Sequence, residues 1–105
     1  MKKISEYDER QLSLMYNNLL AFEKKQVELS SLIGTLEFLL NAMESIENEW
    51  EEKFLNQITI LESMNAIAII KDAGEDAPVI SKDVADRLIN CAVCALKVIV
   101  EEALT

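Results

Sequence analysis

The stretch from Ser30 to Ile70, SSLIGTLEFLLNAMESIENEWEEKFLNQITILESMNAIAII, decides the fold of this chain. Apolar residues recur in it at helical spacing, the pattern breaks in an acidic segment, and the spacing then resumes at Trp50. The apolar positions are Leu32, Ile33, Leu36, Leu39, Leu40 and Met43 before the break, then Trp50, Phe54, Ile58, Leu61 and Met64 after it. This periodicity predicts two helices joined by an acidic elbow, Glu44 to Glu49.

The composition is typical of one small folded domain. Half of the 105 residues are hydrophobic and 28% are charged, which suffices for a single core and argues against disorder. Two glycines, one proline and the absence of short alternating runs argue against strands. We therefore predict an all-α fold, a small bundle of about four helices, with residues 1–105 forming a single helical domain.

Capping residues and breakers place the four helices. A serine or an asparagine can accept a hydrogen bond from a free backbone N–H at a helix start, and a glycine commonly follows a helix end. The expected helices run from Ser5 to Lys25, from Ser30 or Ser31 to Met43, from Asn48 to Asp72 or Ala73 before Gly74, and from Lys82 to Leu104 after a Ser81 cap. The segment from Glu75 to Pro78 is the clearest loop.

Two helices have features that predict how they pack. Gly34 lies inside the second helix, where glycine is unfavourable, so we expect a close helix crossing there. The fourth helix has an unusually broad apolar face and should be the most buried element.

The charge is strongly acidic and unevenly placed. The net charge is -9, and seven acids against Lys53 alone give the stretch from Glu37 to Glu62 a net of -6. Such a field repels nucleic acid and anionic lipid, so we expect neither partner, and a basic protein is the natural complement. A solvated face that only maintains solubility is the alternative. No apolar run reaches the length of about 20 residues that a membrane helix needs, and the amino terminus lacks a signal peptide's apolar core, so we expect a cytoplasmic protein.

The sequence offers little to catalysis. It has no histidine, which removes the commonest general base and the commonest metal ligand. Two cysteines without any histidine are too few ligands for a zinc site. Cys91 and Cys94 lie among apolar residues in the fourth helix, so we expect them to be buried, inert free thiols. We expect no enzyme activity, no metal and no cofactor.

The elbow and its flanks are the candidate binding surface. We name this surface the elbow face, and it consists of Glu44, Glu47, Glu49, Trp50, Glu51 and Glu52. Some of these carboxylates suit a helix start, with Asn48 as cap and Glu51 completing a capping box. Trp50 lies in the apolar stripe of the third expected helix, as a core residue would. A tryptophan is also a common anchor at the centre of a protein interface.

A third of the chain resembles a known family. The pattern S-L-I-x-x-L-E-x-L-L-x-A-L-E, followed by acidic residues, E-W-x-x-x-F and L-E, is similar to that of small, acidic, helical immunity proteins of bacterial polymorphic toxin systems, including contact-dependent growth inhibition. The matching residues are Ser31, Leu32, Ile33, Leu36, Glu37, Leu39, Leu40, Ala42, Glu44, Glu49, Trp50, Phe54, Leu61 and Glu62, with Met43 in place of a leucine.

The resemblance implies an antidote that binds a toxin domain, often a nuclease, in a one-to-one complex. Nuclease domains tend to have basic grooves, and an acidic inhibitor gains steering and specificity by placing carboxylates there. The competing hypothesis is a non-catalytic structural or adaptor bundle that self-associates through its fourth helix. For the antidote a homo-oligomer is possible but is not expected.

Overall fold

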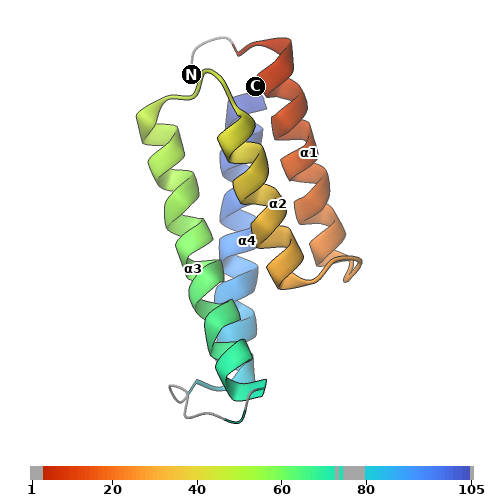
Figure 1. Ribbon diagram of the computed structural model, residues 1–105, viewed down its shortest axis with the longest axis vertical. Helices are drawn as coiled ribbons and strands as arrows, with labels where there is room; N and C mark the ends of the chain where they lie inside the picture. The colour runs from red at the N-terminus through yellow and green to blue at the C-terminus, as the bar shows by residue number, and fades with distance from the viewer. Residues whose placement is uncertain (1–3, 73, 75–79, 105) are drawn as a thin grey trace.

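The computed structural model describes residues 4–72, 74 and 80–104, and these form four α-helices (Figure 1). The prediction of an all-α bundle is confirmed. The first helix, α1, spans Glu6–Glu23, and the Ser5 hydroxyl accepts from the Asp8 N–H at 3.1 Å, as the sequence predicts for an N-cap. After α1 the chain turns at Lys25, which has a positive φ of 61°.

The caps of the second and third helices lie one to three residues before the predicted ones. Helix α2 spans Leu29–Ala42 with Glu28 at its N-cap, so neither Ser30 nor Ser31 caps it. Helix α3 spans Asn48–Asp72, and its first turn is closed by the Glu51 N–H donating to the Glu47 carbonyl at 3.0 Å. That bond puts Glu47, and not Asn48, at the cap position of α3.

The fourth helix begins where the sequence predicts. Helix α4 spans Lys82–Leu104, and the Ser81 hydroxyl accepts from the Val84 N–H at 3.2 Å. Gly74, after α3, has a φ of 77°, the left-handed conformation expected of a glycine that follows a helix. The predicted loop from Glu75 to Pro78 lies outside the described residues.

Consecutive helices run antiparallel and each packs on the next, with α4 closing the ring against α1 (Figure 1). The helices differ in length. At about 1.5 Å per residue, the 25 residues of α3 span about 37 Å and the 14 residues of α2 only about 21 Å. The lower part of the α3–α4 hairpin therefore extends past α1 and α2, away from the elbow (Figure 1).

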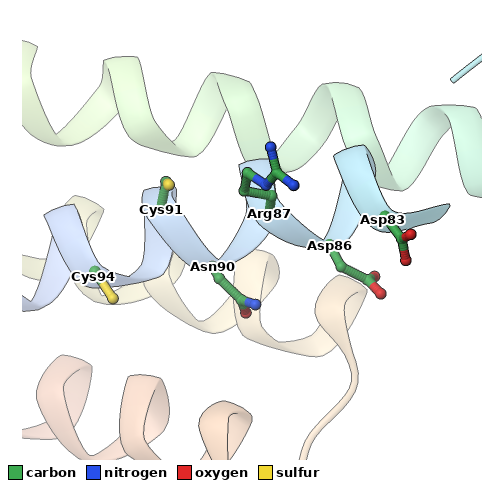
Figure 2. A pocket seen from close by; sticks show the side chains of 6 residues that line it. All are labelled: Asp83, Asp86, Arg87, Asn90, Cys91 and Cys94. Atoms are coloured by element: carbon green, nitrogen blue, oxygen red, sulfur yellow. The ribbon is translucent and has the colours of Figure 1, made fainter. Parts of the chain in front are cut away.

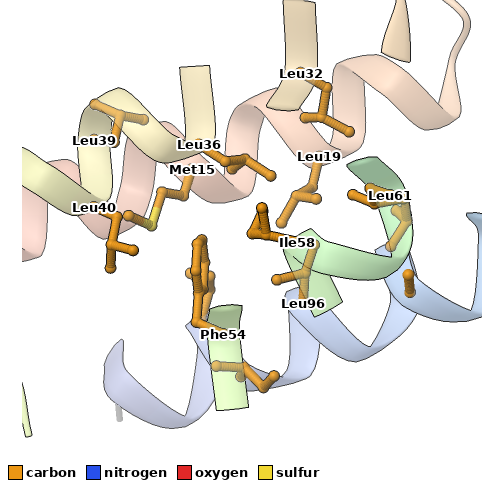
Figure 3. Close-up of a cluster of buried hydrophobic side chains, with 14 of the residues drawn as sticks. Met15, Leu19, Leu32, Leu36, Leu39, Leu40, Phe54, Ile58, Leu61 and Leu96 are labelled. Atoms are coloured by element: carbon orange, nitrogen blue, oxygen red, sulfur yellow. The ribbon is translucent and has the colours of Figure 1, made fainter. Parts of the chain in front are cut away.

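The core occupies the elbow half of the bundle and draws on all four helices (Figure 3). Met15 and Leu19 of α1 meet Leu32 and Leu36 of α2 there, together with Phe54 of α3. Its other large, fully buried apolar side chains are Leu12, Ile58, Leu61, Val93, Leu96 and Val100.

Two packing predictions were wrong. Gly34 is exposed, and no neighbour lies within 4 Å of the place a Cβ would take, so no helix crosses there. Helix α4 has six buried residues among its 23, but α2 is buried over a larger fraction of its length, five residues among 14, so α4 is not the most buried element in proportion to its length. Val84, Leu88 and Val98 of α4 are exposed. Its buried residues begin only at Ala92, where the cover of α1 and α2 is in place.

Candidate functional site

The elbow is fastened to α1 by a buried carboxylate. Asp8, in the first turn of α1, is fully buried, and its two oxygens accept from the backbone N–H groups of Glu44 and Ser45 at 2.8 and 2.9 Å. Bonds to an ionised acceptor are stronger than neutral ones. Asp8 thus satisfies two N–H groups just after α2 and fixes the path of the chain into α3.

Trp50 fixes the other side of the elbow. Its side chain is only 5% exposed, its indole N–H donates to the Ile99 carbonyl of α4 at 2.9 Å, and its ring stacks on Phe54 with centroids 5.2 Å apart. The core interpretation of Trp50 is confirmed. In this conformation four carboxylates of the elbow face are exposed to solvent, while the buried indole positions the start of α3.

The predicted carboxylates lie together at one end of the bundle. Glu44, Glu47, Glu49 and Glu52 are exposed, and Glu51 is half-buried. A depression of about 330 Å³ lies beside them, lined by Glu47, Glu49, Trp50, Lys53 and Glu102. Glu102 comes from the last turn of α4, so three carboxylates and the ammonium group of Lys53 line the hollow together with Trp50.

The acidic end is larger than the sequence indicates. The first turn of α1, the elbow, the start of α3 and the end of α4 meet there (Figure 1). In residues 6–10, 44–53 and 101–104, the charged side chains that are not buried are nine glutamates and the basic residues Arg10 and Lys53, a net of -7. The glutamates are Glu6, Glu9, Glu44, Glu47, Glu49, Glu51, Glu52, Glu101 and Glu102. Lys2 and Lys3 lie outside the described residues.

Helix stabilisation accounts for only part of this charge. Carboxylates in the first turns of α1 and α3 suit the positive end of the helix dipole. Glu101 and Glu102 lie in the last turn of α4, and Glu44 follows the end of α2, where the dipole disfavours negative charge. The dipole interaction with their own helices therefore does not stabilise these three glutamates.

Asp8 and Glu102 were missed by sequence reasoning. Asp8 resembles an ordinary acid of a first helical turn, and its acceptor role depends on a segment 36 residues away. Glu102 joins the elbow only because α4 runs antiparallel to α3. The one available signal was its unfavourable place at a helix end.

The prediction that Cys91 and Cys94 are buried was wrong, whereas the prediction that they are free thiols is confirmed. Both are exposed on the outer surface of α4, beside Asp83, Asp86, Arg87 and Asn90 (Figure 2). Within the described ranges, no group of three or more acid or cysteine side chains is arranged to hold a metal ion.

Two polar contacts join α1 to α4 along the side of the bundle. The Tyr16 hydroxyl donates to Glu101 Oε1 and the Lys97 ammonium to Glu23 Oε1, both at 2.9 Å. The hydrogen bond to Glu101 raises the pKa of Tyr16, and the hydrogen bond to Glu23 raises the pKa of Lys97. Glu101 is therefore held in place, although it stands at the unfavourable end of its helix.

Comparisons with protein-family models, with curated proteins and with solved structures gave no match for this chain. None of the helices in the described part of the chain is long and apolar enough to cross a membrane.

Proposed function

We propose that this chain is an immunity protein that binds and neutralises a toxin domain of the nuclease class in a one-to-one complex. It covers the basic active-site cleft of the toxin, or the adjacent surface, with the elbow face. It works in the cytoplasm by stoichiometric binding and without catalysis. The resemblance of the segment from Ser31 to Glu62 to immunity proteins supports this role.

One observation carries the proposal: glutamates are concentrated at one end of the bundle beyond what helix stability requires. With Arg10 and Lys53 counted, this end has a net charge of -7, and three of its glutamates, Glu44, Glu101 and Glu102, lie at helix ends that disfavour negative charge. Glu101 also accepts a hydrogen bond from Tyr16, but the helix dipole disfavours all three glutamates, and residues that break a local rule of helix stability are typical of functional surfaces. A basic cleft that normally holds phosphates is complementary to this surface.

The elbow is also held in one conformation before any partner arrives. Asp8 binds its first two residues through their N–H groups, and Trp50 anchors the start of α3 to the Ile99 carbonyl. Little conformational entropy is then lost when the carboxylates are bound, and preorganisation of this kind raises affinity. Glutamates at the edge of the interface, which stay in contact with water in the complex, mainly raise the association rate and make it depend on salt concentration.

The alternative function is a structural or adaptor bundle that self-associates. The exposed apolar residues of α4 favour it, because they give two copies a surface through which to pair. Self-association does not need the acidic end, so a test of the elbow face separates the two functions.

The test uses the neighbouring reading frame. If the gene immediately upstream encodes a large secreted protein with a variable carboxy-terminal domain, that domain is the probe. Co-expression of this chain should restore growth of bacteria that produce the domain, and the purified proteins should form a one-to-one complex. Protection when the domain is in large excess would point to catalysis instead.

A triple variant localises the binding surface. Glu47→Gln, Glu49→Gln and Glu52→Gln together remove three charges at the elbow and change side-chain volume little. We expect weaker binding and a shallower salt dependence, with a loss of roughly 2 to 5 kcal/mol for any glutamate that the complex desolvates. The matched control is Glu28→Gln, Glu62→Gln and Asp86→Asn, three exposed acids outside the elbow face. Equal affinities for the two triple variants would reduce the elbow to a solvated face.

A further inference from the structure

Below the packed core, α3 and α4 line a small apolar pocket. Helices α1 and α2 end above the lower part of the hairpin (Figure 1), and none of the described residues of α3 after Leu61 or of α4 before Ala92 is buried. The pocket, which we name the hairpin pocket, has a volume of about 210 Å³ and also touches the start of α2. Its apolar lining includes six half-buried side chains, Leu29, Met64, Ile67, Ile80, Ala85 and Ile89.

The size and lining of the hairpin pocket suit the apolar part of a small molecule. A dry apolar cavity of about 150 Å³ already holds a benzene ring, so this pocket has room for one ring or a short alkyl chain. Ligand pockets are mostly apolar and have a few polar groups that fix the orientation of the ligand. In the hairpin pocket these groups are Lys71, Lys82 and Asp86.

Two of the three polar side chains are lysines from opposite sides of the pocket. The Lys71 ammonium, at the end of α3, donates to the Ile80 carbonyl just before α4 at 3.2 Å. An ammonium group has three N–H donors, so two remain for an anion. Lys82 is exposed at the first position of α4. An anionic group at the rim can therefore meet both lysines.

A second pocket adjoins the hairpin pocket on the side of α1. It has a volume of about 480 Å³, shares Lys82 and Asp86 with the hairpin pocket, and adds Glu23 and Lys25. The Glu23 carboxylate accepts from the Lys97 ammonium at 2.9 Å, which neutralises its charge. With Lys97 counted, four lysines face two acids around the two pockets, a net of +2 in a chain of net charge -9.

The backbone at Lys25 is a further sign that this charge is used. Its φ of 61° is a left-handed conformation that is strained for a lysine and unstrained for a glycine. Strained residues are often found at functional sites, and a lysine at this turn places a cation beside the pockets.

We propose that the hairpin pocket binds a small amphiphilic anion, a carboxylate with a short alkyl or aryl tail. The tail lies between Met64 and Ile67 of α3 and Ile89 of α4, and the carboxylate meets the ammonium groups of Lys71 and Lys82 at the rim. Charge-assisted hydrogen bonds then favour an anion over a neutral or cationic head group. The site lies at the opposite end of the bundle from the elbow face, and the proposal stands whether or not the elbow binds a toxin.

Nuclear magnetic resonance of the methyl-labelled chain, titrated with octanoate, tests the site. The methyl signals of Ile67, Ile80 and Ile89 should shift and saturate at millimolar octanoate or below. The signal of Ile69, which is 58% exposed outside the pocket, should stay in place. Octanol and octylamine should bind at least about tenfold more weakly than octanoate. Equal binding of the three compounds, or no shift with octanoate, would overturn the proposal.

Two matched pairs of variants locate the head group and the tail. Lys82→Gln should weaken octanoate binding about three- to fivefold, whereas Lys24→Gln, at an exposed lysine outside both pockets, should leave it unchanged. Ala85→Leu fills the pocket and should abolish the shifts, whereas Ala66→Leu, at an exposed position of α3 outside it, should not. Equal affinities within either pair would contradict the site. Circular dichroism and thermal melts show whether each variant keeps its fold.

Other occupants of the pocket give different results in the same spectra. If a second copy of the chain covered the pocket, the signals of Ile67, Ile80 and Ile89 would shift with protein concentration alone. If a membrane surface covered it, these signals would broaden with vesicles of phosphatidylglycerol. Either result without a response to octanoate would overturn the proposal.

Discussion

Replacement of Asp8 by asparagine should destabilise the protein through the elbow. Each Asp8 oxygen accepts one N–H, from Glu44 or Ser45, at 2.8 and 2.9 Å. Asparagine keeps one acceptor oxygen and turns an NH2 group toward the second N–H, so one bond is lost and two donors face each other. A hydrogen bond to a charged group contributes about 1.5 to 3 kcal/mol, and we expect Asp8→Asn to cost about 2 to 3 kcal/mol.

The measurement is urea and thermal unfolding followed by circular dichroism. For a domain of this size, the expected loss corresponds to a fall in Tm of roughly 10 to 20 °C. The control is Glu9→Gln, which removes one charge from the same first turn of α1 at an exposed position. Because both variants lose the same favourable dipole interaction, worth about 0.3 to 1 kcal/mol, the difference between them isolates the two N–H bonds.

Nuclear magnetic resonance gives a local check of the same variant. The amide proton shifts of Glu44 and Ser45 should move in Asp8→Asn and stay in place in Glu9→Gln. Equal stability of the two variants, with unmoved Glu44 and Ser45 amides, would refute the role of Asp8 as the residue that fastens the elbow.

Three further predictions concern the core and the side of the bundle. Trp50, the only tryptophan, should emit at short wavelength and be quenched little by acrylamide, and a readily quenched, red-shifted emission would contradict its buried position. Phe54→Ala should cost about 3 to 5 kcal/mol in urea unfolding, against less than about 1 kcal/mol for Leu55→Ala at the exposed neighbour, and similar losses would contradict the observed packing. In Tyr7→Phe, which leaves Tyr16 as the only tyrosine, absorbance should show a pKa above the usual 10.0, and Glu101→Gln should lower it. Because the folded state holds the Tyr16 proton more tightly, this contribution to stability is fully present below pH 10.0 and is lost as pH rises through the folded pKa, so an unshifted midpoint would count against the Glu101 contact.

Local patterns in the sequence predict the four helices well. Apolar spacing, Ser5, Gly74 and Ser81 each act within a few residues, and the structure bears out their predicted roles in starting or ending helices. The concentration of glutamates around residues 44–52 likewise needs no tertiary information. The sequence does not show that glutamates from the start of α1 and the end of α4 add to this acidic surface, because these segments meet the elbow only in the folded bundle.

The wrong predictions share one cause, since periodicity does not tell which apolar face is covered. Cys91 and Cys94 lie among apolar residues in the sequence, and so does Val98, yet the core takes only the stripe that includes Leu96 and Val100. The breadth of the apolar face of α4 indicated two stripes, which we interpreted as one wide buried face. Asp8 shows the reverse error, a charged residue that is buried because a distant backbone segment gives it two donors.

Because the helices differ in length, the elbow half of the bundle contains the packed core, whereas the opposite half consists of α3 and α4 alone. No residue of α4 before Ala92 is buried, and the described part of α3 after Leu61 has no buried residue either. Native-state hydrogen exchange should therefore be graded along both helices, fastest from Met64 to Ile70 and from Val84 to Asn90, and slowest beside Phe54 and Leu96. Local opening would begin at the lower end of the hairpin and leave the elbow intact, so the chain can fray at one end while the other keeps its shape.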